Sequence, residues 1–258
     1  MLRFMNLGAR GFLALALVVT LAGCDDKPSS GTPGATPSAK PQPSAKSEPA
    51  PAVETKPALS LVLDDKRFTA NSDKVDLAAS DPKNAIAGAI AGKSGVEGAI
   101  VDLIVMRETL TPKVALVLAA LRAAKAQGVN VKTLRRDGST TGITFTWGIA
   151  RPECAAVGMI GKDNAITAWT VGGGTAAKFA RGFAGPDLTL GSAGVRKAVQ
   201  ACEATVVYLS AADNITWGLT FDLALAIRGG EDGGAPTRAA NITLLPEAPV
   251  PGRKVATD

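Results

Sequence analysis

The sequence has no histidine among its 258 residues, an aromatic content of only 4% and three cysteines. Histidine is the commonest general base and metal ligand, so its absence lowers the expectation of catalysis or of a metal site. The net charge is only +5, and the basic residues are scattered rather than clustered. Because nucleic-acid binding calls for a basic patch, this composition predicts no nucleic-acid partner. We expect a protein that is not an enzyme and carries no cofactor.

The chain also lacks an apolar run long enough to span a bilayer. Its first 24 residues carry only two charges, Arg3 and Arg10, followed by a short apolar run from Phe12 to Ala22. A charged start, a short apolar stretch and small residues before a cleavage point are typical of a signal peptide. Residues 1–24 are therefore expected to be processed rather than to belong to the fold. An uncleaved anchor is the alternative.

The end of this segment, "LAGC" at 21–24, resembles the lipobox of bacterial lipoproteins. In that family the signal is cut before the cysteine, which is then acylated, for example with palmitate. The resemblance implies that Cys24 is lipidated and anchors the protein to a membrane of the cell envelope, facing the periplasm. Acyl chains hold such an anchor without a transmembrane helix. Asp25 and Asp26 favour the inner membrane by the family's sorting rule. An ordinary secretory signal with an accidental cysteine is the other reading.

Residues 25–58 contain eight prolines among Ser, Ala, Thr and Lys, and no apolar residue larger than Val. Such a segment cannot bury enough apolar surface to offset the entropy lost on ordering. We expect a disordered, extended tether that holds the folded part away from the membrane.

From residue 59 onward, alternating and helical apolar patterns follow one another. Expected strands are 59–63, 75–77, 98–106, 129–136, 165–171, 187–190, 204–211 and 241–245. Expected helices open at Asp81-Pro82, Thr111-Pro112, Ser192 and Thr216, and glycines end most of them. The order predicts an α+β fold.

The two halves of this pattern resemble each other. An offset of 105 residues lays 100–121 on 205–226 without a gap, with Leu110-Thr111 on Ile215-Thr216. We therefore predict two repeated β-β-α-β-α-β units, 59–137 and 138–246, each a small mixed sheet with two helices on one face, before a flexible tail at 247–258. Chance agreement of two generic strand–helix units is the alternative, and the sequence leaves open whether the repeats form one domain or two.

The repeated pattern, and most closely "DNITWG" at 213–218, resembles the periplasmic domain of the ExbD/TolR family of biopolymer-transport proteins. The resemblance implies an interaction module that binds a protein partner in the envelope, with homodimers possible. That family has a transmembrane helix with a proton-carrying Asp, which is missing here, so no proton coupling is implied. A periplasmic scaffold that binds a solute or a glycan is the alternative function.

Residues 85–95, "AIAGAIAGKSG", end like a phosphate-binding loop. A true P-loop needs four residues between its glycines and must open a helix, whereas Gly88 and Gly92 are separated by three and close a predicted helix. The carbonyl end of a helix repels phosphate. We therefore expect no nucleotide, and a solvated Lys93 on a turn.

Three other groups of residues are candidates for chemistry. The backbone of Gly172–Gly174 could bind an anion, although a hairpin turn is the simpler expectation. Four acids could pair for glycosidase-type catalysis or bind calcium, but turn and surface positions explain them better: Asp64, Asp65, Asp73 and Asp76. Three tryptophans could form a sugar-stacking platform, but core packing is the default: Trp147, Trp169 and Trp217.

After acylation of Cys24, two cysteines remain, Cys154 and Cys202. An even pair in an oxidising compartment favours a disulfide. A buried free thiol and a reactive thiol are the alternatives, and the reactive thiol would need an activating base.

Overall fold

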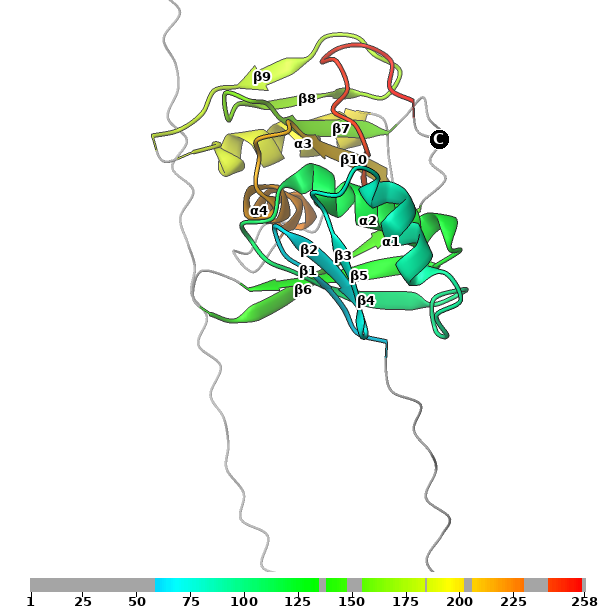
Figure 1. The fold of residues 1–258 in the computed structure, drawn as a ribbon. Coiled ribbons are helices and arrows are strands. Elements are labelled where there is room, and N and C mark those ends of the chain that lie inside the picture. The colour runs from blue at the N-terminus through cyan, green and yellow to red at the C-terminus, as the bar shows by residue number, and fades with distance from the viewer. Residues whose placement is uncertain are drawn as a thin grey trace, which may run out of the picture. The chain divides into compact units, whose positions relative to one another are not determined.

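The computed structural model describes residues 59–134, 138–147, 155–183, 185–201, 206–229 and 241–256. All of them belong to one compact unit, Val53–Asp258. Within these residues eleven strands and four helices form a mixed sheet with helices packed on it, which confirms the α+β class (Figure 1). The sheet is single and continuous, whereas the sequence predicts a small separate sheet for each unit.

The first half of the fold contains β1 (Leu61–Leu63), β2 (Arg67–Ala70), β3 (Asp73–Asp76), α1 (Pro82–Ile90), β4 (Ile100–Val105), α2 (Thr111–Ala123), β5 (Gly128–Leu134) and β6 (Thr140–Thr146). The turn between β1 and β2 is closed by Asp64, whose carboxylate accepts hydrogen bonds from the backbone N–H groups of Lys66 and Arg67. Asp81 caps α1 by accepting from the Asn84 N–H at 3.1 Å, with Pro82 in the first turn, as the sequence predicts.

The second half contains β7 (Ala156–Ile160), β8 (Ile166–Thr170), β9 (Ala177–Phe179), α3 (Leu188–Ala201), β10 (Val206–Ala211), α4 (Trp217–Arg228) and β11 (Asn241–Leu244). The prediction of a strand at 187–190 is wrong. Asp187 accepts a hydrogen bond from the Leu190 N–H at 2.9 Å, so this segment forms the first turn of α3.

The strand order across the sheet is β3-β2-β1-β4-β5-β6-β11-β10-β7-β8-β9. On the side of the first half, β3, β2 and β1 are antiparallel neighbours, and β1, β4 and β5 are parallel neighbours. On the other side, β9, β8 and β7 are antiparallel, and β7, β10 and β11 are parallel. Strand β6 lies between them, antiparallel to β5 and parallel to β11.

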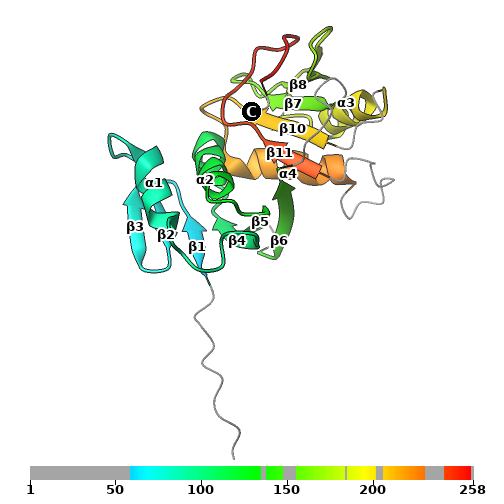
Figure 2. The same ribbon diagram turned by 90° about the vertical axis from the view of Figure 1, so that its right-hand side faces the viewer.

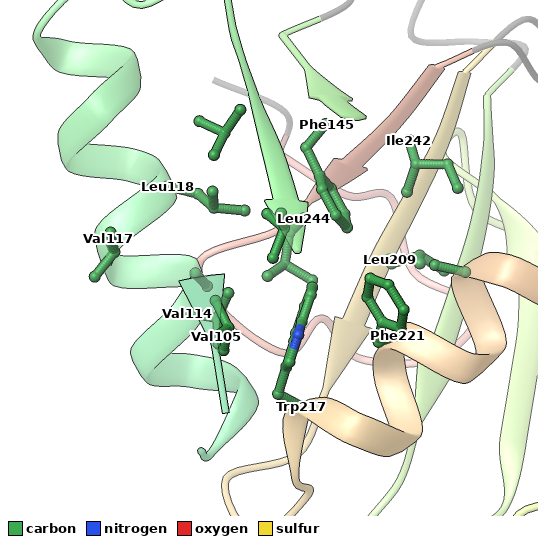
Figure 3. Packing of buried hydrophobic residues seen from close by; sticks show 14 of the residues in the cluster. Val105, Val114, Val117, Leu118, Phe145, Leu209, Trp217, Phe221, Ile242 and Leu244 are labelled. Carbon is green, nitrogen blue, oxygen red and sulfur yellow. The ribbon is translucent and has the colours of Figure 1, made fainter. Parts of the chain in front are cut away.

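The four helices cover one face of the sheet, which we call the inner face. In Figure 1 they lie between β7–β10 above and β1–β6 below. Buried side chains of all four helices and of both halves of the sheet form one main core. Figure 3 shows its centre, where Trp217 packs between Phe145 and Phe221 with ring centroids 5.7 Å apart in each pair.

A smaller core lies on the opposite, outer face of the second half. It contains Val157, Trp169 and Tyr208, and it is closed by Val255 from the end of the chain. Residues 246–256, which we call the strap, cross this face, and the Val255 N–H donates to the Val171 carbonyl at 2.9 Å. The structure therefore differs from the flexible tail predicted for 247–258, because an apolar face is available for the strap to cover.

Candidate functional site

The Gly92-Lys93-Ser94 end of the P-loop-like segment follows α1, as the sequence predicts. The helix ends at Ile90, and Gly92 to Ser94 come after it, so the carbonyl end of the helix faces this turn. Lys93 is half-buried rather than fully solvated as expected, and its ammonium group pairs with the Asp73 carboxylate on β3. The lysine thus ties the turn to the sheet edge.

The glycine turn at 172–174 uses its backbone within the protein. The Gly173 N–H donates to the Thr170 carbonyl at 2.9 Å, and the Gly174 N–H donates to the Gly252 carbonyl at 2.8 Å. Since these donors already have partners, they do not form an anion cradle. Instead the turn holds the strap on the outer face.

The four acids considered for catalysis or calcium binding each make separate local contacts. Asp65 pairs with Lys113 at 3.0 Å, and Asp73 pairs with Lys93. Asp64 and Asp76 each accept hydrogen bonds from backbone N–H groups of the turn that follows them. Among the described residues, no group of three or more acids or cysteines is placed to hold a metal ion.

The three tryptophans do not form a platform. Trp147 donates from its indole nitrogen to the Ala126 carbonyl at 2.5 Å, and Trp169 donates to the Arg253 carbonyl at 3.1 Å. Trp217 lies fully buried in the main core. Cys24, Cys154 and Cys202 lie outside the described residues, so the lipidation and the disulfide remain predictions.

The two halves meet at a junction formed by the starts of α2 and α4, which the sequence does not predict. The Thr111 N–H donates to the Ile215 carbonyl at 2.9 Å, and the Trp217 N–H donates to the Thr109 carbonyl at 2.6 Å. Neither helix has a side-chain cap, so each satisfies its free N–H groups with the other's backbone. Reciprocal capping over a separation of about a hundred residues has no local sequence signal.

Arg107 reinforces this junction from the end of β4. Its guanidinium group binds both carboxylate oxygens of Asp222 on α4, at 2.5 and 3.1 Å, and also reaches the Gly218 carbonyl at 3.4 Å. Two buried polar atoms nearby lack a hydrogen-bond partner among the described residues, the Thr109 hydroxyl and the Trp217 indole nitrogen. Both are enclosed by the core, so we regard this region as structural.

The outer face of the first half carries a different surface. Asp102 on β4 accepts hydrogen bonds from the ammonium group of Lys132 and the amide of Asn130 on β5, both at 2.8 Å. The hydrogen bond from Lys132 is the main reason that the pKa of Asp102 lies below its ordinary value of 3.8. Burial opposes this shift, and the Asn130 bond adds to it. Ile100 and Ile104, the outward residues on either side of Asp102 along β4, are exposed to solvent.

No protein-family model, curated protein or solved structure matches the chain. In the described part of the chain, no helix is both long enough and apolar enough to cross a membrane.

Proposed function

We propose that this protein is a non-catalytic lipoprotein of the cell envelope, anchored through Cys24 and acting as a periplasmic interaction module. The observation that carries the proposal is the order of segments along the chain. A lipobox-like "LAGC" is followed by a proline-rich tether and then by one compact folded unit. This order suits a domain that must reach a partner at some distance from the membrane.

We further propose that the folded unit consists of two related halves and serves a biopolymer-transport complex of the ExbD/TolR kind. The matching strand orders of the two halves support the repeat. The buried positions of α2 and α4 coincide under an offset of 106 residues, since Thr111, Val114 and Leu118 then correspond to Trp217, Thr220 and Ala224. The offset of 105 predicted from the sequence is one residue too short for the helix starts.

The candidate acids and the glycine turn make ion pairs and hydrogen bonds within the protein, which favours an interaction role over catalysis. Each of the four candidate acids is committed to a turn or an ion pair, and the glycine turn holds the strap.

The experiment is affinity capture from detergent-solubilised membranes with an epitope tag placed in the tether, away from the buried Val255. We expect co-purification of an integral membrane protein of a proton-driven transport complex. The Cys24→Ser chain is the control, because it should leave the membrane fraction and lose that partner. Recovery of the tagged chain without any membrane partner would contradict the interaction role. Retention of Cys24→Ser in membranes would contradict the lipid anchor.

A further inference from the structure

The strap contacts the outer face of the second half chiefly through its backbone. Three donors on that face bind carbonyl oxygens of the strap: the Ser210 hydroxyl binds Glu247 at 3.2 Å, the Gly174 N–H binds Gly252 at 2.8 Å, and the Trp169 indole nitrogen binds Arg253 at 3.1 Å. In Figure 2 the strap is the red segment that follows β11 and runs beside β10 and β7. Backbone contacts of this kind depend little on which side chains the bound segment carries.

Only one side chain anchors the strap. From Pro246 to Lys254 every side chain is exposed or half-buried. Val255 is the exception at 6% exposed, and it belongs to the smaller core together with Trp169 and Tyr208. A segment with one buried side chain and an otherwise solvated surface opens locally at a lower free energy than the main core. The strap is therefore the part of this face that can be displaced.

A tight turn gives the strap a defined shape. The Arg253 N–H donates to the Val250 carbonyl at 3.1 Å, which makes Pro251 and Gly252 the central residues of a β-turn. Because proline fixes a negative φ and Gly252 has a φ of 77°, the turn is of type II. A Cβ atom at Gly252 would also lie 2.8 Å from the Gly174 carbonyl oxygen. Glycine is therefore required at this position of the bound segment.

The glycine turn at 172–174 is shaped for the close approach of another backbone. A Cβ atom at Gly173 would lie 3.1 Å from the Gly252 carbonyl oxygen and 3.1 Å from the Lys254 nitrogen. Gly173 also has a φ of 91°, which other residues rarely adopt. The glycines that resemble an anion cradle in the sequence thus form a surface for a peptide backbone.

These contacts define the segment that the face accepts. It needs a Pro-Gly turn and, three residues after the glycine, an apolar residue whose N–H can donate to the Val171 carbonyl, as Val255 does. The chain contains one other Pro-Gly pair, Pro33-Gly34 in the tether, and the residue three positions later is Pro37. Proline has no N–H group, so the tether does not meet this requirement. A competing segment must come from another protein.

We infer that the outer face of the second half is a groove for an extended segment of a partner protein with the pattern Pro-Gly-x-x-apolar. The strap occupies this groove until such a segment displaces it. Because the strap is joined to the groove, it competes at a high effective concentration, and a partner segment binds tightly only when the strap is loosened. The inference rests on the interaction role proposed above and specifies the chemistry that the partner must present.

The test is the binding of a fluorescent peptide of residues 246–258 to the purified full-length chain in detergent, followed by anisotropy. We expect weak binding to the wild-type chain and at least about tenfold tighter binding to Val255→Asp, whose own strap has lost its anchor. Val255→Ala should give an intermediate affinity. The matched control is Val250→Asp, which changes an exposed residue of the same strap and should bind the peptide no better than the wild type.

Variants of the peptide test the pattern, with Val255→Asp as the receiving chain. Gly252→Ala or Val255→Asp in the peptide should weaken binding by at least about tenfold, because each removes a feature that the groove requires. A peptide of tether residues 29–40, with Pro37 at the anchor position, should not bind. Affinity should stay within about threefold when serine replaces three exposed residues of the peptide: Glu247, Arg253 and Lys254.

Circular dichroism shows which chains are folded. Folded Val255 variants that bind the peptide no better than the wild type would overturn the inference, and so would a Gly252→Ala peptide that binds as well as the unaltered one. Unfolding of both Val255 variants would also overturn it, since a displaceable strap cannot be essential to the fold. Peptide binding uses purified protein, whereas affinity capture reports a partner in membranes, so failure of the groove is distinguishable from failure of the envelope role.

Discussion

The guanidinium group of Arg107 binds the carboxylate of Asp222 in a bidentate pair, with the closer N–O distance 2.5 Å. The residues are 115 positions apart, and both side chains are mostly buried. The pair joins the end of β4 in one half to α4 in the other, next to the reciprocal capping of the two helices. The stability of the whole unit should therefore depend on this contact.

Asp222→Asn should lower the free energy of unfolding by about 1–2 kcal/mol, because it leaves the partly buried guanidinium without its counter-charge. Urea unfolding followed by circular dichroism measures this loss. The control is Asp213→Asn, since Asp213 is exposed and lies 4.0 Å from Lys162, at the limit of an ion pair. That change should cost less than about 0.5 kcal/mol. Equal losses in the free energy of unfolding for the two variants would show that the Arg107–Asp222 pair does not stabilise the contact between the halves.

Thr109→Val should stabilise the protein by about 1 kcal/mol. The Thr109 hydroxyl is fully buried without a hydrogen-bond partner, so an apolar group of the same shape removes a desolvated polar atom. Thr111→Val is the matched control and should destabilise by about 1 kcal/mol, because the Thr111 hydroxyl shares a 2.8 Å hydrogen bond with Thr220. Urea midpoints of the two variants should therefore move in opposite directions. A lower midpoint for Thr109→Val would mean that its hydroxyl has a partner in solution.

Gly88→Ala and Gly191→Ala should also have opposite effects, although both glycines lie in helices. A methyl group at Gly88 meets no atom within 4 Å. Alanine should therefore raise the free energy of unfolding by up to about 1 kcal/mol, because its helix propensity exceeds that of glycine. A methyl group at Gly191 would approach the Cβ atom of Ile166 to 2.8 Å, and this atom cannot swing away. The resulting overpacking of α3 on β8 should cost about 1–3 kcal/mol. Thermal unfolding measures the stability change of each variant. A more stable Gly191→Ala protein would contradict the close packing of α3 on β8.

Val255→Ala should lower the free energy of unfolding by about 1.5–2 kcal/mol, the value of two buried carbon atoms. Val255 is 6% exposed and closes the smaller core against the outer face of the second half. Val250→Ala is the matched control on the same strap, and at 59% exposed it should cost less than about 0.5 kcal/mol. A neutral Val255→Ala would show that the strap does not stabilise the fold in solution.

Much of the secondary structure could be predicted from local signals. The Asp81-Pro82 start of α1 and the Thr111 start of α2 appear in the structure where the sequence places them. A strand also lies within 98–106, but the apolar run predicts a buried strand, whereas every second residue of β4 is exposed. The sequence does not predict strands β6, β7 and β9, because they are short or contain glycine and threonine. Gly158 in β7, for example, is required by the close approach of Val195 and Leu209, which only the folded chain reveals.

The candidate sites were harder to predict, because their contacts are long-range. Asp64 and Asp76 accept hydrogen bonds from local turns, but no sequence pattern points to the ion pairs of Asp65 and Asp73. The sequence also gives no sign of the Arg107–Asp222 pair or of the burial of Val255. The predicted offset of 105 residues rests on the similar dipeptides Leu110-Thr111 and Ile215-Thr216. The buried positions of α2 and α4 coincide instead under an offset of 106, because burial depends on the folded chain and not on similar residue types.

Asp102→Asn should reduce stability only above the pH at which the carboxyl group titrates. The folded pKa of Asp102 is lowered, chiefly by the hydrogen bond from Lys132, so its charge stabilises the protein above about pH 4. This contribution is lost as the pH falls from the unfolded pKa through the folded one. The loss at neutral pH should be about 0.5 kcal/mol, since more than half of the side chain is exposed. Urea unfolding from about pH 7 to about pH 2 should show the wild-type and variant curves converging in acid. A difference that stays constant across that range would mean that the charge of Asp102 does not stabilise the folded protein.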